Sequence, residues 1–204
     1  RISSIEVTEL NDAVLEVIKS NKVIVDHLHI PLQAGSDEIL KAMNRKYNLD
    51  YYKNKIKQIR SIRPDISIST DIIVGFPGED EKLFEQTLKT AQSIAFSKIH
   101  VFPYSIRKNT KAASMPNQVD GKIKKERAKR LIELSKELEI EYMNKFVGKT
   151  VEVLTENNKD DITYGHTGNF LHVKINKVLP NDLLKMVKIT SVSYPYVIGE
   201  LIDE

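Results

Sequence analysis

The sequence has no cysteine among its 204 residues, which excludes disulfides and any metal or cluster held by thiolates of this chain. It also lacks an apolar run near the roughly 20 residues that cross a bilayer, and no charged and apolar leader stands at its start. We therefore expect a cytoplasmic protein without a membrane partner. Because it begins with Arg1 instead of methionine, we interpret it as a piece of a longer protein.

Positive and negative side chains are nearly balanced in number, since the formal net charge is +3 and the isoelectric point is near 8.8. This mildly basic character permits a polyanionic partner but does not require one. A hydrophobic fraction of 41% and a charged fraction of 29% are typical of a globular protein. The length fits one large domain, or one medium domain and one small domain.

The segment Ile66–Glu79 organises the chain. Its β-branched residues form a short apolar run, which is typical of a strand covered on both faces. Asp71 interrupts that run, and a carboxylate is costly to bury without a partner. Gly75 and Gly78 then break the strand. Ligands of α/β proteins bind at the carboxyl ends of parallel strands, so we expect a site between Asp71 and Gly78.

Strand and helix patterns alternate over the first two thirds of the chain, which predicts an α/β fold with parallel strands. Four strands cannot close an eight-stranded barrel, so they form either a small open sheet or the later part of a barrel whose first strands are missing. The predicted strands cover 4–7, 22–30, 66–74 and 97–102, and the predicted helix caps are Thr8, Ser36 and Asp50.

The composition changes near Phe146, after a long helix predicted over 120–145. From there apolar and polar residues alternate between turn signals such as Gly148 and Pro180, which predicts a small all-β module of about five strands. We therefore place the domains at 1–145 and 146–204.

Three polar residues are expected to meet at the strand-end edge: Gln33, Arg45 and Asp71. Together they could recognise a ligand that carries ribose hydroxyls and a carboxylate. Asp accepts hydrogen bonds from hydroxyls, and Arg binds carboxylates through two parallel hydrogen bonds. The alternative is that Arg45 and Asp71 pair with each other or cap helices. The five histidines show no metal-ligand spacing, although His29 could touch a substrate.

Four segments resemble the radical S-adenosylmethionine methylthiotransferase family: HLHIPLQAGSDEILKAMNRKY, STDIIVGFPGE, VFPYSIRKNTKAASM and YGHTGNFLHVKI. The resemblance runs over nearly the whole chain. It implies a partial barrel of six βα units, of which this chain would hold strands three to six and the closing helix over 1–145. It also implies a small β-barrel of the TRAM type, an OB-like RNA-binding module, over 146–204.

Within the family, the FPYS, RK-T-AA-M and SYPY-GEL patterns resemble the branch that acts on threonylcarbamoyladenosine in tRNA. The branches for isopentenyladenosine and for a ribosomal-protein aspartate are similar but less close. The resemblance implies methylthiolation of C2 of N6-threonylcarbamoyladenosine beside the anticodon. It further implies S-adenosylmethionine and two [4Fe-4S] clusters as cofactors. The implied partners are the tRNA anticodon stem-loop, the missing amino-terminal part and an electron donor such as flavodoxin.

The wider radical SAM superfamily, including oxygen-independent coproporphyrinogen oxidases, has a similar Gln-to-Arg spacing followed by an Asp. By this resemblance Gln33 and Asp71 contact the ribose hydroxyls and Arg45 contacts the methionine carboxylate. Gly75 and Gly78 would let the backbone approach the adenine.

Basic and aromatic residues suggest where RNA could bind. Arg107, Lys108 and Lys111 flank the expected pocket and suit tRNA phosphates, whereas the basic run 53–63 is interpreted as a solvated helix face. In the β module a stacking strip is predicted, although alternating aromatics are often core and the module could be only a packing lid. The strip consists of Tyr164, His166, Asn169, Phe170, His172 and Lys174.

The cluster cysteines of the family are absent, so the resemblance also implies that this piece alone is inactive. The rival interpretation is a stand-alone RNA-binding protein that kept the barrel only as a scaffold.

Overall fold

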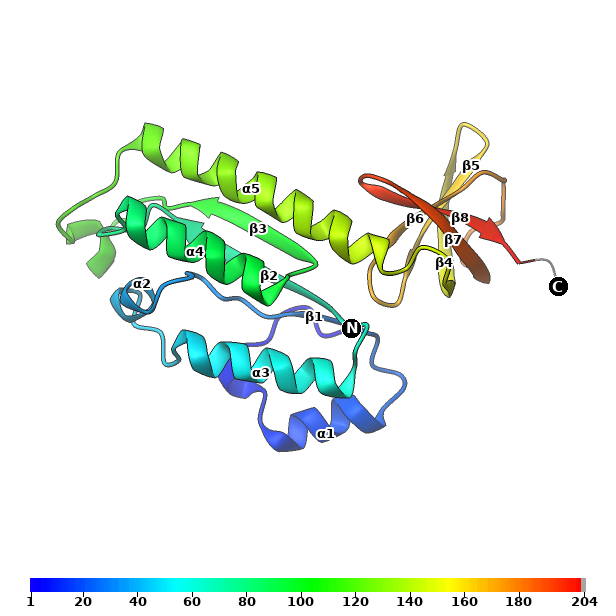
Figure 1. The fold of residues 1–204 in the computed structure, drawn as a ribbon, viewed down its shortest axis with the longest axis horizontal. Coiled ribbons are helices and arrows are strands. Elements are labelled where there is room, and N and C mark those ends of the chain that lie inside the picture. The colour runs from blue at the N-terminus through cyan, green and yellow to red at the C-terminus, as the bar shows by residue number, and fades with distance from the viewer. Residues whose placement is uncertain (203–204) are drawn as a thin grey trace. The chain divides into compact units, whose positions relative to one another are not determined.

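A computed structural model describes residues 1–202, and the chain divides into two compact units (Figure 1). Unit 1 comprises Arg1–Ile24 and Leu28–Leu138. Unit 2 comprises Val25–His27 and the residues from Glu139 onward. None of the helices in the described part of the chain has the length and apolar character required to span a membrane.

Unit 1 is built on a three-stranded sheet in the order β1-β2-β3. The strands are β1 (His27–His29), β2 (Ser67–Val74) and β3 (Lys98–Pro103). Strands β2 and β3 are parallel, with Asp71 opposite His100. The predicted α/β class and parallel strands are therefore confirmed.

Helices connect these strands, and α4 and α5 lie alongside β2 and β3 (Figure 1). Their bounds are α1 (Asp12–Ser20), α2 (Asp37–Ala42), α3 (Leu49–Ile62), α4 (Glu81–Ile94) and α5 (Gly121–Asn144), with 3-10 turns η1 (Val7–Glu9) and η2 (Lys111–Ser114). On α5, Ser135 Oγ accepts from the Ile99 amide of β3 at 3.0 Å, which ties the helix to the strand.

Two strand predictions were wrong. Instead of a strand at 4–7, the chain makes a parallel bridge between Ile2 and Leu28 and one hydrogen bond from the Ile5 amide to the His29 carbonyl at 3.0 Å. It then turns into η1, where the Glu9 carboxylate accepts from the Glu6 amide. The strand predicted over 22–30 shortens to β1. Val23 is 85% exposed and its amide donates to the Asn21 side chain, so the chain turns at the surface here before β1 begins.

The helix starts follow short polar side chains that accept from the third amide along. Ser36 caps α2 as predicted, but Asn11 caps α1 and Asn48 caps α3, so the predicted caps Thr8 and Asp50 were wrong. Asn11 directly precedes the acidic first residue of α1, Asp12, and Asn48 lies two residues before Asp50. Sequence spacing alone therefore did not show which polar residue caps each helix.

The basic run of α3 is not simply a solvated face. Arg63 donates to the Ile18 and Asn21 carbonyls at the end of α1, with its Nη2 2.6 Å from Ile18 O. Arg60 Nη2 donates to the Ala95 carbonyl at the end of α4 at 2.7 Å. Cations at helix carboxyl ends satisfy orphan carbonyls and favour the helix dipole.

A buried ion pair closes the turn after β2. The Arg127 guanidinium of α5 donates to the Glu79 carbonyl at 2.8 Å and to its carboxylate at 3.2 Å, and the same carboxylate accepts from the Gly75 amide. The side chains of Arg127 and Glu79 are only 4% and 1% exposed. Burial raises the pKa of Glu79, an effect opposed by the Gly75 amide and by Arg127. This pair connects β2, α4 and α5 at one point.

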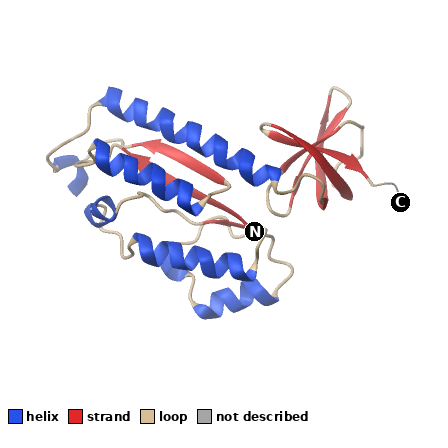
Figure 2. Ribbon diagram, viewed as in Figure 1, coloured by secondary structure: helices blue, strands red, loops and turns tan. Residues whose placement is uncertain are grey.

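Unit 2 contains a closed five-stranded barrel in the order β4-β5-β6-β8-β7 (Figure 2). The strands are β4 (Thr150–Lys159), β5 (Ile162–Thr167), β6 (His172–Ile175), β7 (Leu184–Ser193) and β8 (Tyr196–Leu201). The prediction of about five strands is confirmed.

The barrel follows the period-two pattern of its strands, because alternate residues point inward. Val153, Val173, Val187 and Val197 are fully buried. Gly199 faces this interior, where a Cβ would collide with Val187.

The end of α5 packs in the barrel unit, since Tyr142 and Met143, together with Phe146 just after the helix, belong to its apolar core. The boundary between the two compact units accordingly lies between Leu138 and Glu139, inside α5. The domain bounds 1–145 and 146–204 stay a prediction.

The buried pair predicts a strong effect on stability. Replacing Arg127 by Met leaves the Glu79 carboxylate buried without its cation, so we expect the free energy of unfolding to fall by about 3–5 kcal/mol. Chemical denaturation measures this change. The control is Lys129→Met on the same helix, whose exposed pairing with Glu133 should contribute about 1 kcal/mol or less. Equal effects of the two substitutions would contradict the structural role of the pair.

Candidate functional site

A cavity of about 490 Å³ lies at the carboxyl ends of β2 and β3 in unit 1. Two of the three predicted polar residues, Gln33 and Asp71, contribute to its wall. The full lining is Gln33, Asp71, Ile73, Phe102, Pro103, Tyr104, Ser105, Arg107, Thr110 and Ala112.

Backbone pairing places Gln33 beside Asp71. The Gln33 amide donates to the Asp71 carbonyl at 2.8 Å, and the Ile73 amide donates to the Gln33 carbonyl at 2.9 Å. Gln33 also has a φ of 71°, an uncommon conformation for a residue other than glycine. Such strain is often kept at ligand sites, where the surrounding structure holds it.

Arg45 does not line this cavity. Its Nη1 lies 2.8 Å from the Glu6 carboxylate, so Arg45 and Asp71 do not pair with each other. The Nε of Arg45 is buried and has no hydrogen-bond partner among the described residues. The structure therefore brings two members of the predicted trio together and gives the third an acidic neighbour that the sequence did not indicate.

Asp71 has histidine neighbours instead. Its Oδ2 lies 3.3 Å from His29 Nε2, and the other nitrogen of that ring lies 2.9 Å from Ser69 Oγ. The His29 and His100 rings are 5.6 Å apart. The potential ligand atoms of His29, Asp71 and His100 all lie within 4.8 Å of one another. Sequence spacing did not reveal this group, because parallel pairing unites residues from three separate strands.

The two predicted glycines differ in their surroundings. Gly75 and Gly78 both have positive φ, 73° and 88°, which other residues adopt with strain. A Cβ on Gly75 would collide with the Lys124 side chain, whereas Gly78 has no atom within 4 Å of such a Cβ. Gly75 is thus required by packing against α5, and Gly78 is the open position of the turn.

Tyr104 lines the cavity and has a buried hydroxyl. Its ring packs edge-on against Phe76 at 5.2 Å, and its carbonyl accepts from Lys124 Nζ at 3.1 Å. Its hydroxyl is buried without a hydrogen-bond partner in the described part of the chain. Sequence reasoning did not select Tyr104, although an aromatic residue directly after a parallel strand could have indicated a cavity wall.

The predicted basic residues lie on the segment after β3. Arg107 is part of the cavity wall, and Lys108 and Lys111 are exposed next to it in sequence. The Arg107 carbonyl accepts from the Thr110 hydroxyl at 2.8 Å, which holds the turn between them. The chain therefore places positive charge at the rim of the cavity.

The aromatic strip predicted for unit 2 is a continuous stack on the outer face of the barrel. The rings of His166 and His172 are parallel within 6° at 4.4 Å, and Phe170 stacks on His166 at 4.8 Å. Tyr196 extends the stack from His172 at 4.4 Å and reaches Tyr164 at 5.3 Å. Phe170 is 48% exposed. Tyr196 was not predicted, because β8 joins β6 only through the barrel.

Polar groups accompany this stack. Tyr164 lies opposite Lys174 in the register of β5 and β6, and Glu156 Oε2 lies 2.7 Å from His166 Nδ1. Burial, and next the neighbouring His166, lower the pKa of His172. Asn169 instead is buried and donates to the Tyr142 hydroxyl at 3.0 Å, so its predicted place in the strip was wrong.

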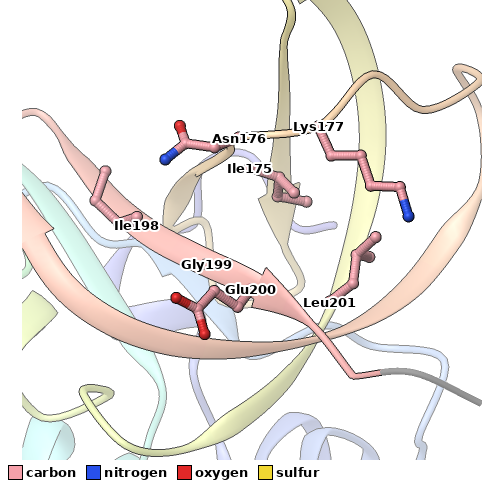
Figure 3. Close-up of a pocket in the computed structure, with 7 residues that line it drawn as sticks. All are labelled: Ile175, Asn176, Lys177, Ile198, Gly199, Glu200 and Leu201. Atoms are coloured by element: carbon pink, nitrogen blue, oxygen red, sulfur yellow. The ribbon is translucent and has the colours of Figure 1, made fainter.

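The barrel also has a smaller hollow of about 360 Å³, shown in Figure 3. Lys177 and Glu200 are its charged residues, and Ile175, Ile198 and Leu201 are its apolar ones. No predicted site residue lies there.

Comparison with known proteins identifies the fold of residues 2–91, which match the model of the Radical SAM superfamily. The solved structure of coproporphyrinogen III oxidase from Escherichia coli, a radical SAM enzyme, superposes on 92% of this chain and 45% of its own, with a TM-score of 0.54. Its sequence identity is 15%, so this likeness concerns the fold alone.

Curated relatives match along most of the chain. The threonylcarbamoyladenosine tRNA methylthiotransferase of Bacillus subtilis is 38% identical over 99% of this chain and 46% of its own length. The tRNA-2-methylthio-N(6)-dimethylallyladenosine synthase of Desulfitobacterium hafniense is 45% identical over 76% of this chain and 36% of its own. The Thermotoga maritima threonylcarbamoyladenosine enzyme is 43% identical over the same shares.

The chain thus spans less than half the length of these three relatives. The match to both kinds of tRNA methylthiotransferase, together with the superfamily match, confirms the resemblance predicted from the motifs. The comparisons thus support the radical SAM methylthiotransferase family, a family of transferase enzymes, as the one that this chain resembles.

Proposed function

We propose that this chain forms the S-adenosylmethionine and tRNA binding part of a tRNA methylthiotransferase. The observation that carries the proposal is the cavity at the ends of β2 and β3, walled by Gln33 and Asp71 and bordered by Arg107. Its position agrees with the general rule that ligands bind at the carboxyl ends of parallel strands. According to this proposal, unit 1 is part of a partial βα barrel.

The donors and acceptors of the cavity suit S-adenosylmethionine. The Asp71 carboxylate and the Gln33 amide would hold the ribose hydroxyls. Arg45 and Gly78 lie outside the lining of the cavity, so their roles toward the methionine carboxylate and the adenine rest on the family resemblance and not on the cavity. When bound, S-adenosylmethionine would supply the methyl group and a radical able to attack an unactivated C–H bond.

The residues of this chain do not fit an iron–sulfur cluster, because it has no cysteine. We propose that any cluster, and the electron donor that reduces it, act with parts of a longer protein. This chain alone is then inactive, although it retains the binding surfaces.

RNA binding would use both units. The barrel presents stacked rings that end in exposed Phe170, with Lys174 opposite Tyr164, and bases stack favourably on such rings. This arrangement supports the assignment of unit 2 as a TRAM module. Arg107, Lys108 and Lys111 would contact phosphates of the anticodon stem-loop near the cavity. Such a protein would work in the cytoplasm, where tRNA is modified.

Two adenosine substrates compete. The Bacillus subtilis relative named for threonylcarbamoyladenosine aligns with 99% of the chain, but a Thermoanaerobacter pseudethanolicus relative named for dimethylallyladenosine aligns with 96% at 41% identity, so alignment length does not separate the two substrates. The Desulfitobacterium hafniense relative, named for dimethylallyladenosine, has the higher identity of 45% but aligns with only 76%. We propose threonylcarbamoyladenosine, because the FPYS, RK-T-AA-M and SYPY-GEL patterns resemble the branch that acts on that nucleoside, and keep dimethylallyladenosine as the second candidate.

The nucleoside content of tRNA tests this choice. Deleting the gene in its own organism should remove 2-methylthio-threonylcarbamoyladenosine from digested tRNA, as measured by mass spectrometry. The 2-methylthio form of dimethylallyladenosine serves as the internal control and should persist. The reverse pattern would support the second candidate, and persistence of both forms would reject the proposed activity.

Asp71→Asn tests the nucleoside site. The substitution removes a charge-assisted hydrogen bond to the ribose, so S-adenosylmethionine affinity of the full-length protein should fall by about 1.5–3 kcal/mol in isothermal titration calorimetry. Exposed Glu38 lies outside this cavity, and Glu38→Gln is the charge-matched control. Unchanged affinity in Asp71→Asn would refute the assignment of the ribose to this carboxylate.

Changing Arg107, Lys108 and Lys111 to Ala tests the phosphate contacts. Loss of three cations should weaken tRNA binding and reduce the slope of log affinity against log salt by about 2 to 3, because fewer counterions are released. Fluorescence anisotropy over a salt series measures both quantities. The control changes three lysines of α3, Lys53, Lys55 and Lys57, with the same loss of charge. An unchanged slope would shift the RNA contacts to the barrel.

A further inference from the structure

We propose that His29, Asp71 and His100 form a binding site for a divalent transition-metal ion of the zinc type. Their three potential ligand atoms lie within 4.8 Å of one another. Two imidazole nitrogens and one carboxylate oxygen are a donor set that Zn²⁺, Co²⁺ and Fe²⁺ bind in proteins. A small rearrangement of the side chains would bring the three atoms to the shorter separations that a shared ion requires.

The sheet itself produces this convergence. Asp71 of β2 and His100 of β3 are direct partners in the parallel register, so their side chains leave the same face of the sheet. His29 ends β1, and the next amide, Ile30, donates to Ser69 of β2 at 2.9 Å. Each of three adjacent strands therefore supplies one ligand at the same level, from a rigid framework.

Ser69 orients the first imidazole. Its Oγ lies 2.9 Å from His29 Nδ1, while His29 Nε2 faces Asp71 Oδ2 at 3.3 Å. A metal ion on Nε2 requires the proton on Nδ1, where the serine hydroxyl accepts it. Metal-bound histidines are held in this way by a hydrogen bond to their second nitrogen.

The burial of the three residues suits a site with open positions. The side chains of His29 and Asp71 are 13% and 29% exposed, and His100 is exposed at the outer edge of the group. Three protein ligands on one side leave room for water or another ligand on the other side. His100 adds a third potential ligand atom to the pair of His29 and Asp71, as a metal site with three protein ligands requires.

The site shares Asp71 with the nucleoside site of the proposed function, and this part of the inference rests on that proposal. A carboxylate that coordinates an ion is no longer available to accept from ribose hydroxyls. We therefore expect the metal ion and S-adenosylmethionine to compete. His100 takes no part in the proposed nucleoside contacts. Substitution of His100 should therefore weaken metal binding without changing the affinity for S-adenosylmethionine.

Metal titration of the chain tests the site. After treatment with a chelator, Zn²⁺ should bind with a stoichiometry of one in isothermal titration calorimetry, and Co²⁺ should give a visible absorption band of a nitrogen-ligated site. His29→Ala and His100→Ala should each lower the affinity about 100-fold, and Ser69→Ala about tenfold. His172→Ala removes a barrel imidazole outside the group and should leave the affinity unchanged.

The contradicting results are equally clear. Zn²⁺ affinity that survives in the double variant His29→Ala, His100→Ala would refute the site, as would an equal loss in His172→Ala. Circular dichroism verifies that the variants fold, and exposed His100 gives a variant with little risk of misfolding. His100→Ala should keep its S-adenosylmethionine affinity in the full-length protein, so failure of the metal site is distinguishable from failure of the nucleoside site.

Discussion

The buried pair of Arg127 and Glu79 is the constraint on which unit 1 depends. A charge removed from water must have a partner, and here each ion has one, supported by the Gly75 amide. The pair joins the end of β2 to the start of α4 and to α5. Because these three elements meet there, the turn after β2 has a defined shape, and Phe76 of that turn packs against Tyr104 of the cavity wall.

The same physical rule acts on Asp71 of β2, with a different result. Asp71 also requires a partner, but its partner is His29, a group whose charge depends on protonation and which binds metals readily. A pair of this kind leaves the carboxylate available to a ligand in a way that a buried arginine would not. The contrast explains why Glu79 is structural and Asp71 is a candidate site residue, although both acids belong to one short segment.

The barrel unit shows how one alternating pattern serves two purposes. Its inward residues are small and β-branched, so the interior fills with valines and with Gly199. Its outward residues on β5, β6 and β8 place His166, His172 and Tyr196 in one stack. The stack needs strands that are not neighbours in sequence, and the closed order β4-β5-β6-β8-β7 supplies them.

The sequence by itself determined the α/β class, the five-stranded module and the family resemblance, because periodicity and contiguous motifs are local properties. The sequence also indicated Gln33 and Asp71 as site residues, because Gln33 follows a predicted strand and Asp71 interrupts the apolar run of another. Only the tertiary structure decided the partners: Glu6 for Arg45, and His29 with His100 for Asp71. Pairing energy depends on distance in space, and parallel strands bring together residues that the chain separates by a whole helix.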